Sequence, residues 1–184
     1  ALKSNTEGDF NTALGRDAML SNTTADGNTG IGYGVLYNNT TGADNVAVGK
    51  EALDRNTTGH SNVSVGVDSL GDNIDGHSNT AVGFEAMKAN TDKDWSVAVG
   101  IQALKAEESS GSNVAVGALS MPICNGASNN VAVGKQTGYL LTTGDYNVFV
   151  GSNAGFNNTT AAGNTAVGYT ALYANTTGAA NTAV

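Results

Sequence analysis

The sequence predicts an all-β fold, a parallel β-solenoid (β-roll) built from 17-residue coils. The five-residue phrase Asn-(Thr/Val)-Ala-Val-Gly returns every 17 residues along the 184-residue chain, without insertion or deletion. The chain is also rich in glycine, with 25 residues, and contains one proline. An α-solenoid is excluded because its repeats run from about 20 to 47 residues and need helix-forming residues that this chain lacks. One strand-bearing coil per repeat, stacked on the next, fits this period.

The repeat divides the chain into 17 columns, with column 1 at the asparagine that opens the phrase. Residues 1–184 are expected to form a single repeat domain of ten full repeats starting at Asn11, with a partial repeat at each end. We expect this domain to be a segment of a longer fibre. Column 1 falls at Asn11, Asn28, Asn45, Asn62, Asn79, Ser96, Asn113, Asn130, Asn147, Asn164 and Asn181.

Columns 2 to 4 are predicted to form the main strand of each coil. Column 2 is always Thr or Val and column 4 is always aliphatic, the period of two expected of a strand with one buried face. We therefore expect columns 2 and 4 to point into the coil. Column 3, mostly Ala, would then form a smooth outer ladder with the glycine of column 5. Columns 8 and 9, a small residue followed by Leu or Met, predict a second short strand.

Column 5 is glycine in all ten full repeats, which indicates a turn that needs a positive φ or has no room for a side chain. Columns 12 to 15, often Asn-Thr-Thr-Gly as in residues 39–42, carry further turn chemistry. The structural turn glycines are Gly15, Gly32, Gly49, Gly66, Gly83, Gly100, Gly117, Gly134, Gly151 and Gly168.

Charge and composition narrow the partners. The formal net charge is −8, so a nucleic-acid backbone would be repelled. No apolar run approaches the roughly 18 residues of a membrane span, so membrane insertion is not expected. A 17-residue coil buries few apolar side chains against the entropy of ordering its backbone. We therefore expect each chain to bury further surface against copies of itself, as a homo-oligomer.

The repeat resembles those of two groups of extended surface proteins. Residues 45–49, 113–117 and 130–134, each Asn-Val-Ala-Val-Gly, resemble the head repeats of YadA-like trimeric adhesins. Residues 164–178 are similar to repeats in phage and virus tail-fibre proteins. The resemblance implies a left-handed roll and a homotrimer. It also implies an extracellular, cell-surface or virion location, and a structural or adhesive role with a host glycan or protein receptor. Adhesin-head repeats are usually shorter, about 14 to 15 residues, so columns 13 to 17 imply a wider coil or a second layer.

No pattern in the sequence predicts catalysis, a cofactor or a metal site. His60 and His77 share column 16 of adjacent coils, as two hydrated turn residues or as a metal pair. Aromatic residues of columns 6 and 10 either stack on a sugar or cover the rim of the roll: Tyr33, Tyr37, Phe84, Tyr139, Phe156, Tyr169 and Tyr173.

The least regular stretch, residues 105–141, is the candidate interaction stretch. A departure from a repeat marks either neutral drift or a place where a partner replaces lost contacts. The residues that depart most are Glu107, Glu108, Pro122, Cys124, Leu140 and Leu141.

The function that the sequence favours is a structural fibre segment that contributes to attachment. An ice-binding β-solenoid is the alternative, since Thr is abundant, although the Thr of columns 13 and 14 are adjacent and are expected to face opposite ways. A tailspike-type glycan-processing enzyme is disfavoured, because it would need a groove built by irregular, longer coils.

Overall fold

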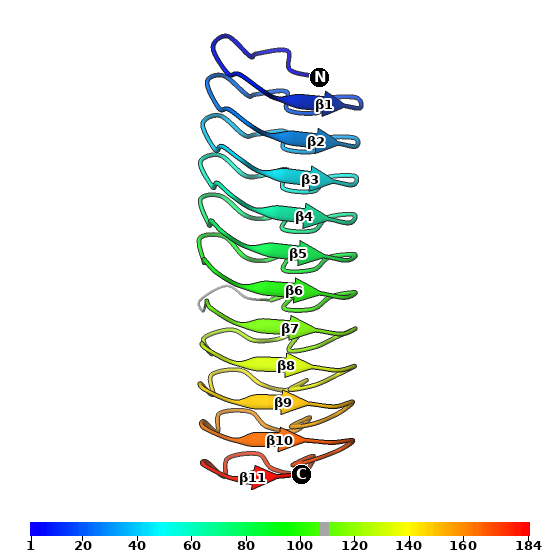
Figure 1. Cartoon of the computed structure of the whole chain (residues 1–184), viewed down its shortest axis with the longest axis vertical. Coiled ribbons are helices and arrows are strands. Elements are labelled where there is room, and N and C mark those ends of the chain that lie inside the picture. The colour runs from blue at the N-terminus through cyan, green and yellow to red at the C-terminus, as the bar shows by residue number, and fades with distance from the viewer. Residues whose placement is uncertain (107–110) are drawn as a thin grey trace.

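The computed structural model describes residues 1–106 and 111–184 and shows an all-β solenoid of about ten turns (Figure 1). One short strand per coil joins a single parallel sheet in chain order, β1 to β11. The strands are β1 Thr12–Leu14, β2 Thr29–Ile31, β3 Val46–Val48, β4 Val63–Val65, β5 Thr80–Val82, β6 Val97–Val99, β7 Val114–Val116, β8 Val131–Val133, β9 Val148–Val150, β10 Thr165–Val167 and β11 Thr182–Ala183.

The register is uniform, because each residue pairs with the residue 17 positions further along the chain. Ala81 pairs with Ala98, for example, and Ala98 pairs with Ala115. The predicted β-solenoid of 17-residue coils is therefore confirmed. The described residues contain no helix, and hence none long and apolar enough to cross a membrane.

The second strand predicted at columns 8 and 9 is wrong. Columns 6 to 11 form turns, and columns 7, 9 and 17 have left-handed backbone conformations. In the coil that contains β3, these positions are Glu51 (φ 56°), Leu53 (φ 52°) and Ser61 (φ 58°). A left-handed backbone conformation is unfavourable for leucine in isolation. Here this conformation allows a 17-residue coil to close, and the complete burial of the Leu53 side chain offsets its cost.

The predicted direction of the strand faces is also wrong. Column 3 points inward, as with Ala47 and Ala98, which have no exposed surface, whereas columns 2 and 4 point outward. The reason is the narrowness of the coil. A Cβ placed on Gly30 would lie 2.9 Å from Met19 Cε and 3.2 Å from Val35 Cγ1, so column 3 has room for little more than a methyl group. We call columns 6 to 11, the turns that follow each strand, the return segment. Its columns 8 and 9 fill the core instead.

One coil solves the packing differently. Phe149 occupies column 3 of β9 and is fully buried, and column 9 is glycine both in its own coil, at Gly155, and in the preceding coil, at Gly138. A Cβ on Gly155 would lie 2.8 Å from three atoms of the Phe149 ring. The ring therefore fills the space that leucine or methionine fills elsewhere, which shows that columns 3 and 9 face each other across the core.

The ten column-5 glycines lie directly after the strands, with φ between +127° and +145°. In Gly15 through Gly151, an added Cβ would approach the backbone of the next column-5 glycine to between 2.2 and 2.7 Å. At Gly83 the nearest atom would be the Gly100 carbonyl oxygen, at 2.4 Å. Both the backbone conformation and the spacing of the coils at this turn therefore require glycine.

Two buried rows of asparagine side chains, in columns 1 and 12, run along the rod. Asn39 Nδ2 in column 12 donates to Asn22 Oδ1 of the preceding coil at 3.0 Å, and to the Gly42 carbonyl oxygen of its own coil at 2.9 Å. In column 1, the Asn45 backbone N–H donates to Asn28 Oδ1 at 2.9 Å. These side-chain amides satisfy turn carbonyls and backbone N–H groups that would otherwise be buried without partners.

Candidate functional site

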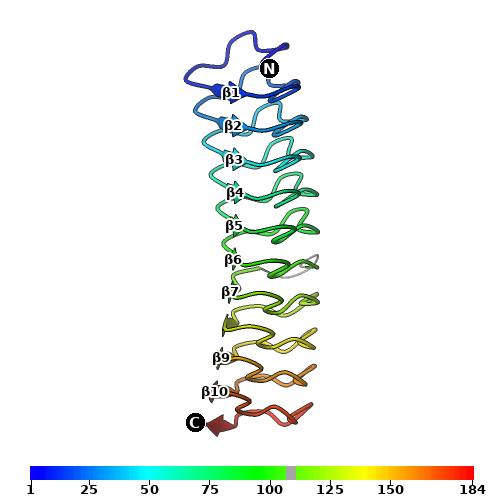
Figure 2. The same ribbon diagram turned by 90° about the vertical axis from the view of Figure 1, so that its right-hand side faces the viewer.

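The outward side of the sheet is a regular surface that extends over all eleven strands, and we call columns 2 and 4 of β1 to β11 the strand face. Figure 2 shows the strands along one edge of the rod and the turns along the other. Column 2 is Thr or Val in every strand, column 4 is Leu, Ile or Val, and neither column contains a charged residue. Its most exposed apolar members are Leu14, Ile31, Val46, Val63, Val133, Val148, Val167 and Val184.

The strand face is apolar but not covered. Val46 is 38% exposed and Val148 is 37% exposed, while column 3 between the two ranks is fully buried. In a parallel sheet neighbouring strands lie about 4.8 Å apart, so the two ranks form a flat surface that repeats at that spacing. An uncharged surface with this many exposed aliphatic side chains is a candidate interaction surface. Sequence reasoning missed this face. The signal that reveals it is the joint change of Phe149, Gly138 and Gly155, which places column 3 inside.

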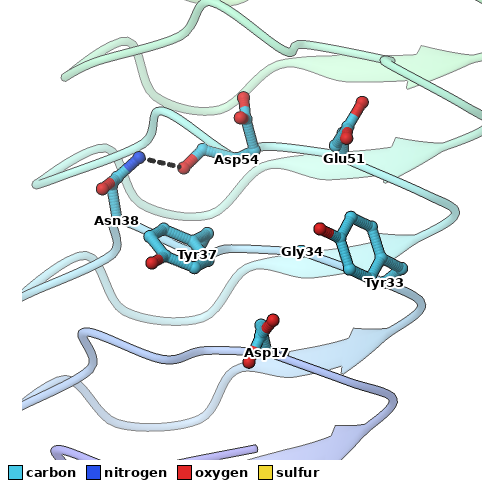
Figure 3. A pocket seen from close by; sticks show the side chains of 7 residues that line it. All are labelled: Asp17, Tyr33, Gly34, Tyr37, Asn38, Glu51 and Asp54. Atoms are coloured by element: carbon cyan, nitrogen blue, oxygen red, sulfur yellow. Dashed lines mark hydrogen bonds between the residues drawn. The ribbon is translucent and has the colours of Figure 1, made fainter.

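A cleft opens on the other side of the rod, where the return segment passes through column 7 (Figure 3). We call it the Gly34 cleft, because Gly34 stands where the neighbouring coils have Asp17 and Glu51. Its volume is about 280 Å³. Tyr33 and Tyr37 lie on either side of Gly34 in Figure 3. The full lining is Asp17, Tyr33, Gly34, Tyr37, Asn38, Glu51 and Asp54.

The cleft is acidic. The pKa of Asp54 is raised from 3.8 to about 6, chiefly by burial, with repulsion from Asp68, Glu51 and Asp72 adding to it and the nearby Arg55 opposing it. Asp17 and Glu51 each have one basic neighbour in sequence, Arg16 Nε at 3.2 Å and Lys50 Nζ at 3.5 Å, in exposed pairs. The Arg16 guanidinium also lies 5.8 Å from the centroid of the Tyr33 ring.

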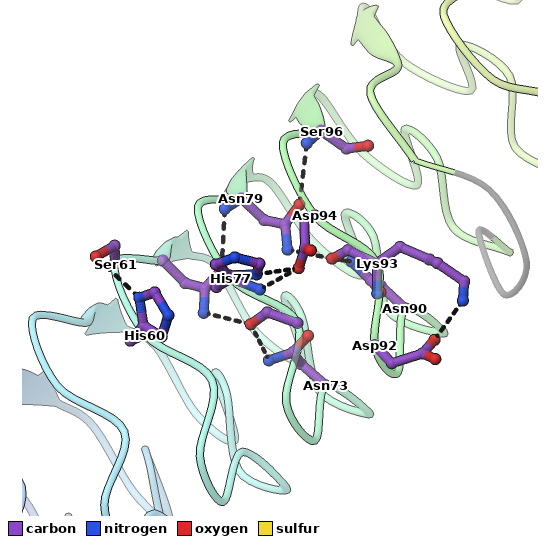
Figure 4. A network of polar contacts seen from close by, with 12 residues as sticks. His60, Ser61, Asn73, His77, Asn79, Asn90, Asp92, Lys93, Asp94 and Ser96 are labelled. Carbon is purple, nitrogen blue, oxygen red and sulfur yellow. Dashed lines mark hydrogen bonds and ion pairs between the residues drawn. The ribbon is translucent and has the colours of Figure 1, made fainter.

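His60 and His77 lie in a polar cluster at the turns that lead into β4 and β5 (Figure 4). Their ring centroids are 4.7 Å apart, and the His77 ring lies 5.5 Å from that of Trp95. The His77 ring also contacts Asp94, which accepts a 2.8 Å hydrogen bond from the His77 backbone N–H. Among residues 1–106 and 111–184, no group of three or more His, Cys, Asp or Glu side chains could hold a metal ion.

The aromatic residues do not form one row. Tyr139 and Phe156 stack at 4.9 Å between ring centroids, and Phe156 and Tyr173 at 5.2 Å, so these three rings pack face to face along the rod. Tyr33 and Tyr37 instead flank the Gly34 cleft. Tyr169 and Phe84 are exposed singly, at 76% and 46%.

The candidate interaction stretch is only partly on the surface. Cys124 and Leu141 replace column-12 asparagines and are fully buried, and Pro122 is buried as well. Leu140 is half-buried, while Glu107 and Glu108 lie outside the described residues. The two buried replacements interrupt the column-12 amide row. Asn158 Nδ2, whose acceptor would lie at position 141, has no hydrogen-bond partner.

Comparison with known proteins identifies no relative. No protein-family model, no curated protein and no solved structure matches the chain. The class of protein is therefore defined by the fold, a regular parallel β-solenoid with one apolar strand face and a turn side that carries an acidic cleft.

Proposed function

We propose that this chain is a structural segment of a fibre, part of an extracellular appendage of a cell surface or virion that contributes to attachment. The observation that carries the proposal is the strand face, an apolar surface without charge along a rod of unvarying coils. A rod of this kind would have two roles in a fibre. Its length would fix the distance between the parts that it joins, and its surface would determine which partner binds. The proposal assigns no catalytic step to the chain.

The partner that best fits the strand face is a second copy of the same face. A partner surface must repeat at the spacing of the coils to stay in register over eleven strands, and another copy of this chain has that spacing by construction. Shallow ranks of Val, Thr, Leu and Ile can interdigitate with similar ranks and leave water out. We propose a homo-oligomer held by these faces. A trimer, with three faces turned toward a common axis, is the form that the repeat resemblance implies.

The oligomeric mass of the full chain tests the proposal. We expect sedimentation equilibrium to give three times the chain mass, and small-angle scattering to give a thin rod. The pair Val97→Glu and Val99→Glu places two carboxylates on the strand face of one coil, where association would bury them without partners. This variant is expected to dissociate to monomers at low micromolar concentration.

A matched control places a charge on the same coil but off the strand face. Ile101, in column 6, is 56% exposed, and Ile101→Glu is expected to leave the oligomer intact. A wild-type chain that is monomeric, or an Ile101→Glu variant that dissociates as readily as the strand-face variant, would overturn the proposed interface.

One observation favours an ice-binding solenoid as a second candidate. Thr12, Thr29 and Thr80 point outward from column 2 on a flat sheet, although column 4 contains no threonine. The threonines of column 13 are engaged elsewhere, as Thr40 Oγ1 donates to the Thr57 carbonyl oxygen at 3.0 Å. Thermal hysteresis of the purified chain decides between the candidates, since a fibre segment gives none and an ice-binding face does.

A further inference from the structure

The Gly34 cleft combines two features that occur together in no other coil among the described residues. The first is a gap in the column-7 row. The other nine members of that row have side chains, whereas Gly34 has none, and the gap lies between the side chains of Asp17 and Glu51 on adjacent coils. The second is a pair of aromatic walls, because Tyr33 and Tyr37 stand on either side of the gap (Figure 3).

The chemistry of the lining is selective for charge. Three carboxylates, two phenol rings and one amide line the cleft, and no lysine or arginine does. The face of a tyrosine ring attracts cations, and a carboxylate beside it adds to that attraction. The structure already contains one such contact to a ring that lines the cleft, since the Arg16 guanidinium lies 5.8 Å from the Tyr33 ring centroid. An anionic ligand would be repelled both by the lining and by the net charge of −8.

Asp54 is the carboxylate of the cleft lining that has no ion-pair partner among the described residues. Asp17 and Glu51 have exposed basic neighbours, and Arg55 makes its ion pair with Asp72 at 3.1 Å. Asp54 makes no ion pair within the described residues, and burial together with the acidic groups Glu51, Asp68 and Asp72 raises its pKa. A cation in the cleft would compensate this half-buried carboxylate.

We propose that the Gly34 cleft is a binding site for an organic ammonium group, held between the rings of Tyr33 and Tyr37 with Asp54 and Glu51 as counter-charges. The size of the cleft supports a small ligand. A volume of about 280 Å³ lies just below the range of typical ligand pockets, which is about 300 to 1,000 Å³. A tetraalkylammonium head group fits this chemistry because it has a diffuse positive charge and an apolar surface that suits aromatic walls.

The site lies away from the strand face. Columns 3 and 9 meet in the core, so the outward residues of the return segment lie on the other side of the coil from columns 2 and 4. Association through the strand face therefore leaves the cleft open, and the two proposals are tested separately.

The test uses choline chloride as the probe and its neutral isostere, 3,3-dimethyl-1-butanol, as the comparison. Binding to the full wild-type chain is followed by NMR, through the amide signals of residues 33–38, at constant ionic strength. Choline is expected to shift these signals saturably at millimolar concentration, and the neutral isostere is expected to leave them unchanged. A neutral monosaccharide, methyl glucoside, is titrated in parallel.

The decisive variant is Gly34→Gln, which restores the side chain that column 7 has elsewhere. Gly34 has φ +63°, and Gln102 and Gln136 have φ 54° and 53° in the same column, so glutamine suits this backbone. An added Cβ would meet only Glu51 Cγ, at 3.6 Å. We expect the filled cleft to lose choline binding at least ten-fold. Asn153→Gln, a column-7 change several coils away, should leave the affinity unchanged.

A second variant separates the aromatic walls from general acidity. Tyr37→Leu places at column 10 the residue that Leu20 provides in the preceding coil, and removing one ring from the cation site is expected to weaken choline binding about five-fold or more. Equal binding of choline and its neutral isostere, binding of the glucoside alone, or choline affinity that survives Gly34→Gln would each overturn the proposal.

Discussion

Replacement of Phe149 by alanine is expected to show how this solenoid balances its core across two columns. The ring has no exposed surface and fills the space above two glycines, Gly138 and Gly155. Phe149→Ala restores the usual column-3 residue but leaves column 9 empty, so a cavity forms. A phenylalanine truncated to alanine in a packed core costs about 3–5 kcal/mol. Urea unfolding followed by far-ultraviolet circular dichroism measures this loss.

The informative step is the reverse change in column 9. Gly155→Leu alone forces a side chain whose Cβ lies 2.8 Å from the ring atoms of Phe149, and overpacking of this kind costs about 1–3 kcal/mol. Gly155 has φ +60°, and leucine occupies the same column at φ 52° in Leu53, so the backbone accepts the change. In the double variant the new leucine fills the cavity that the ring leaves. We therefore expect the double variant to be more stable than Phe149→Ala alone.

The coupling between the two changes tests the reasoning. If columns 3 and 9 share one volume, the stability losses are far from additive, with a coupling of about 2 kcal/mol in favour of the double variant. Losses that add to within about 0.5 kcal/mol would refute the shared volume, and with it the inward direction of column 3.

Three further outcomes are expected. Deletion of residues 45–61, one whole repeat, should give a shorter folded rod by circular dichroism, whereas deletion of residues 45–60 should unfold it, because a one-residue slip inverts the strand faces; equal melting temperatures would contradict this. Gly83→Val should lower the melting temperature sharply, since its Cβ would lie 2.4 Å from the Gly100 carbonyl oxygen, and a neutral effect would disprove the close approach of coils. The folded-state pKa of Asp54 is raised to about 6, so the folded chain binds this proton more tightly than the unfolded chain does. The stabilisation that protonated Asp54 provides is therefore fully present below its unfolded-state pKa and is lost as the pH rises through 6. Asp54→Asn should therefore stabilise the chain more at pH 7 than at pH 4 in urea unfolding, and the opposite order would show that the carboxylate is not buried as described.

The architecture follows from the sequence because a fixed period is a global signal. The phrase that opens at column 1 sets the coil length, and the coil length sets the register of all ten strand pairings. No single residue needs to be interpreted for this to hold.

The direction of the strand faces cannot be predicted from the alternation of side chains alone. Alternation assigns the residues of a strand to two faces, but it does not determine which face points into the core. Val and Thr at columns 2 and 4 are the more apolar set, and burial by hydrophobicity alone places them in the core. The core is too narrow for them, as the 2.9 Å approach at Gly30 shows. The leucines of column 9 suggest a strand in the sequence, because nothing in their residue type predicts a left-handed backbone. Of the Gly34 cleft, only Tyr33 and Tyr37 were singled out from sequence. The cleft arises from one missing side chain between two coils.

The bonding pattern of the coils has a mechanical consequence. The strands, and the asparagine amides of columns 1 and 12 where they are present, link a coil to its immediate neighbours. When a single chain is pulled from its two ends, a terminal coil is expected to detach first, because it has a neighbour on one side only. The chain is then expected to unfold one coil at a time rather than all at once. Each released coil adds a contour length of about 56–61 Å, the extended reach of 17 residues at roughly 3.3–3.6 Å each. A single chain pulled in isolation is expected to extend in steps of equal length. In an oligomer associated through the strand face, each step must also break the interchain contacts of the coil that detaches.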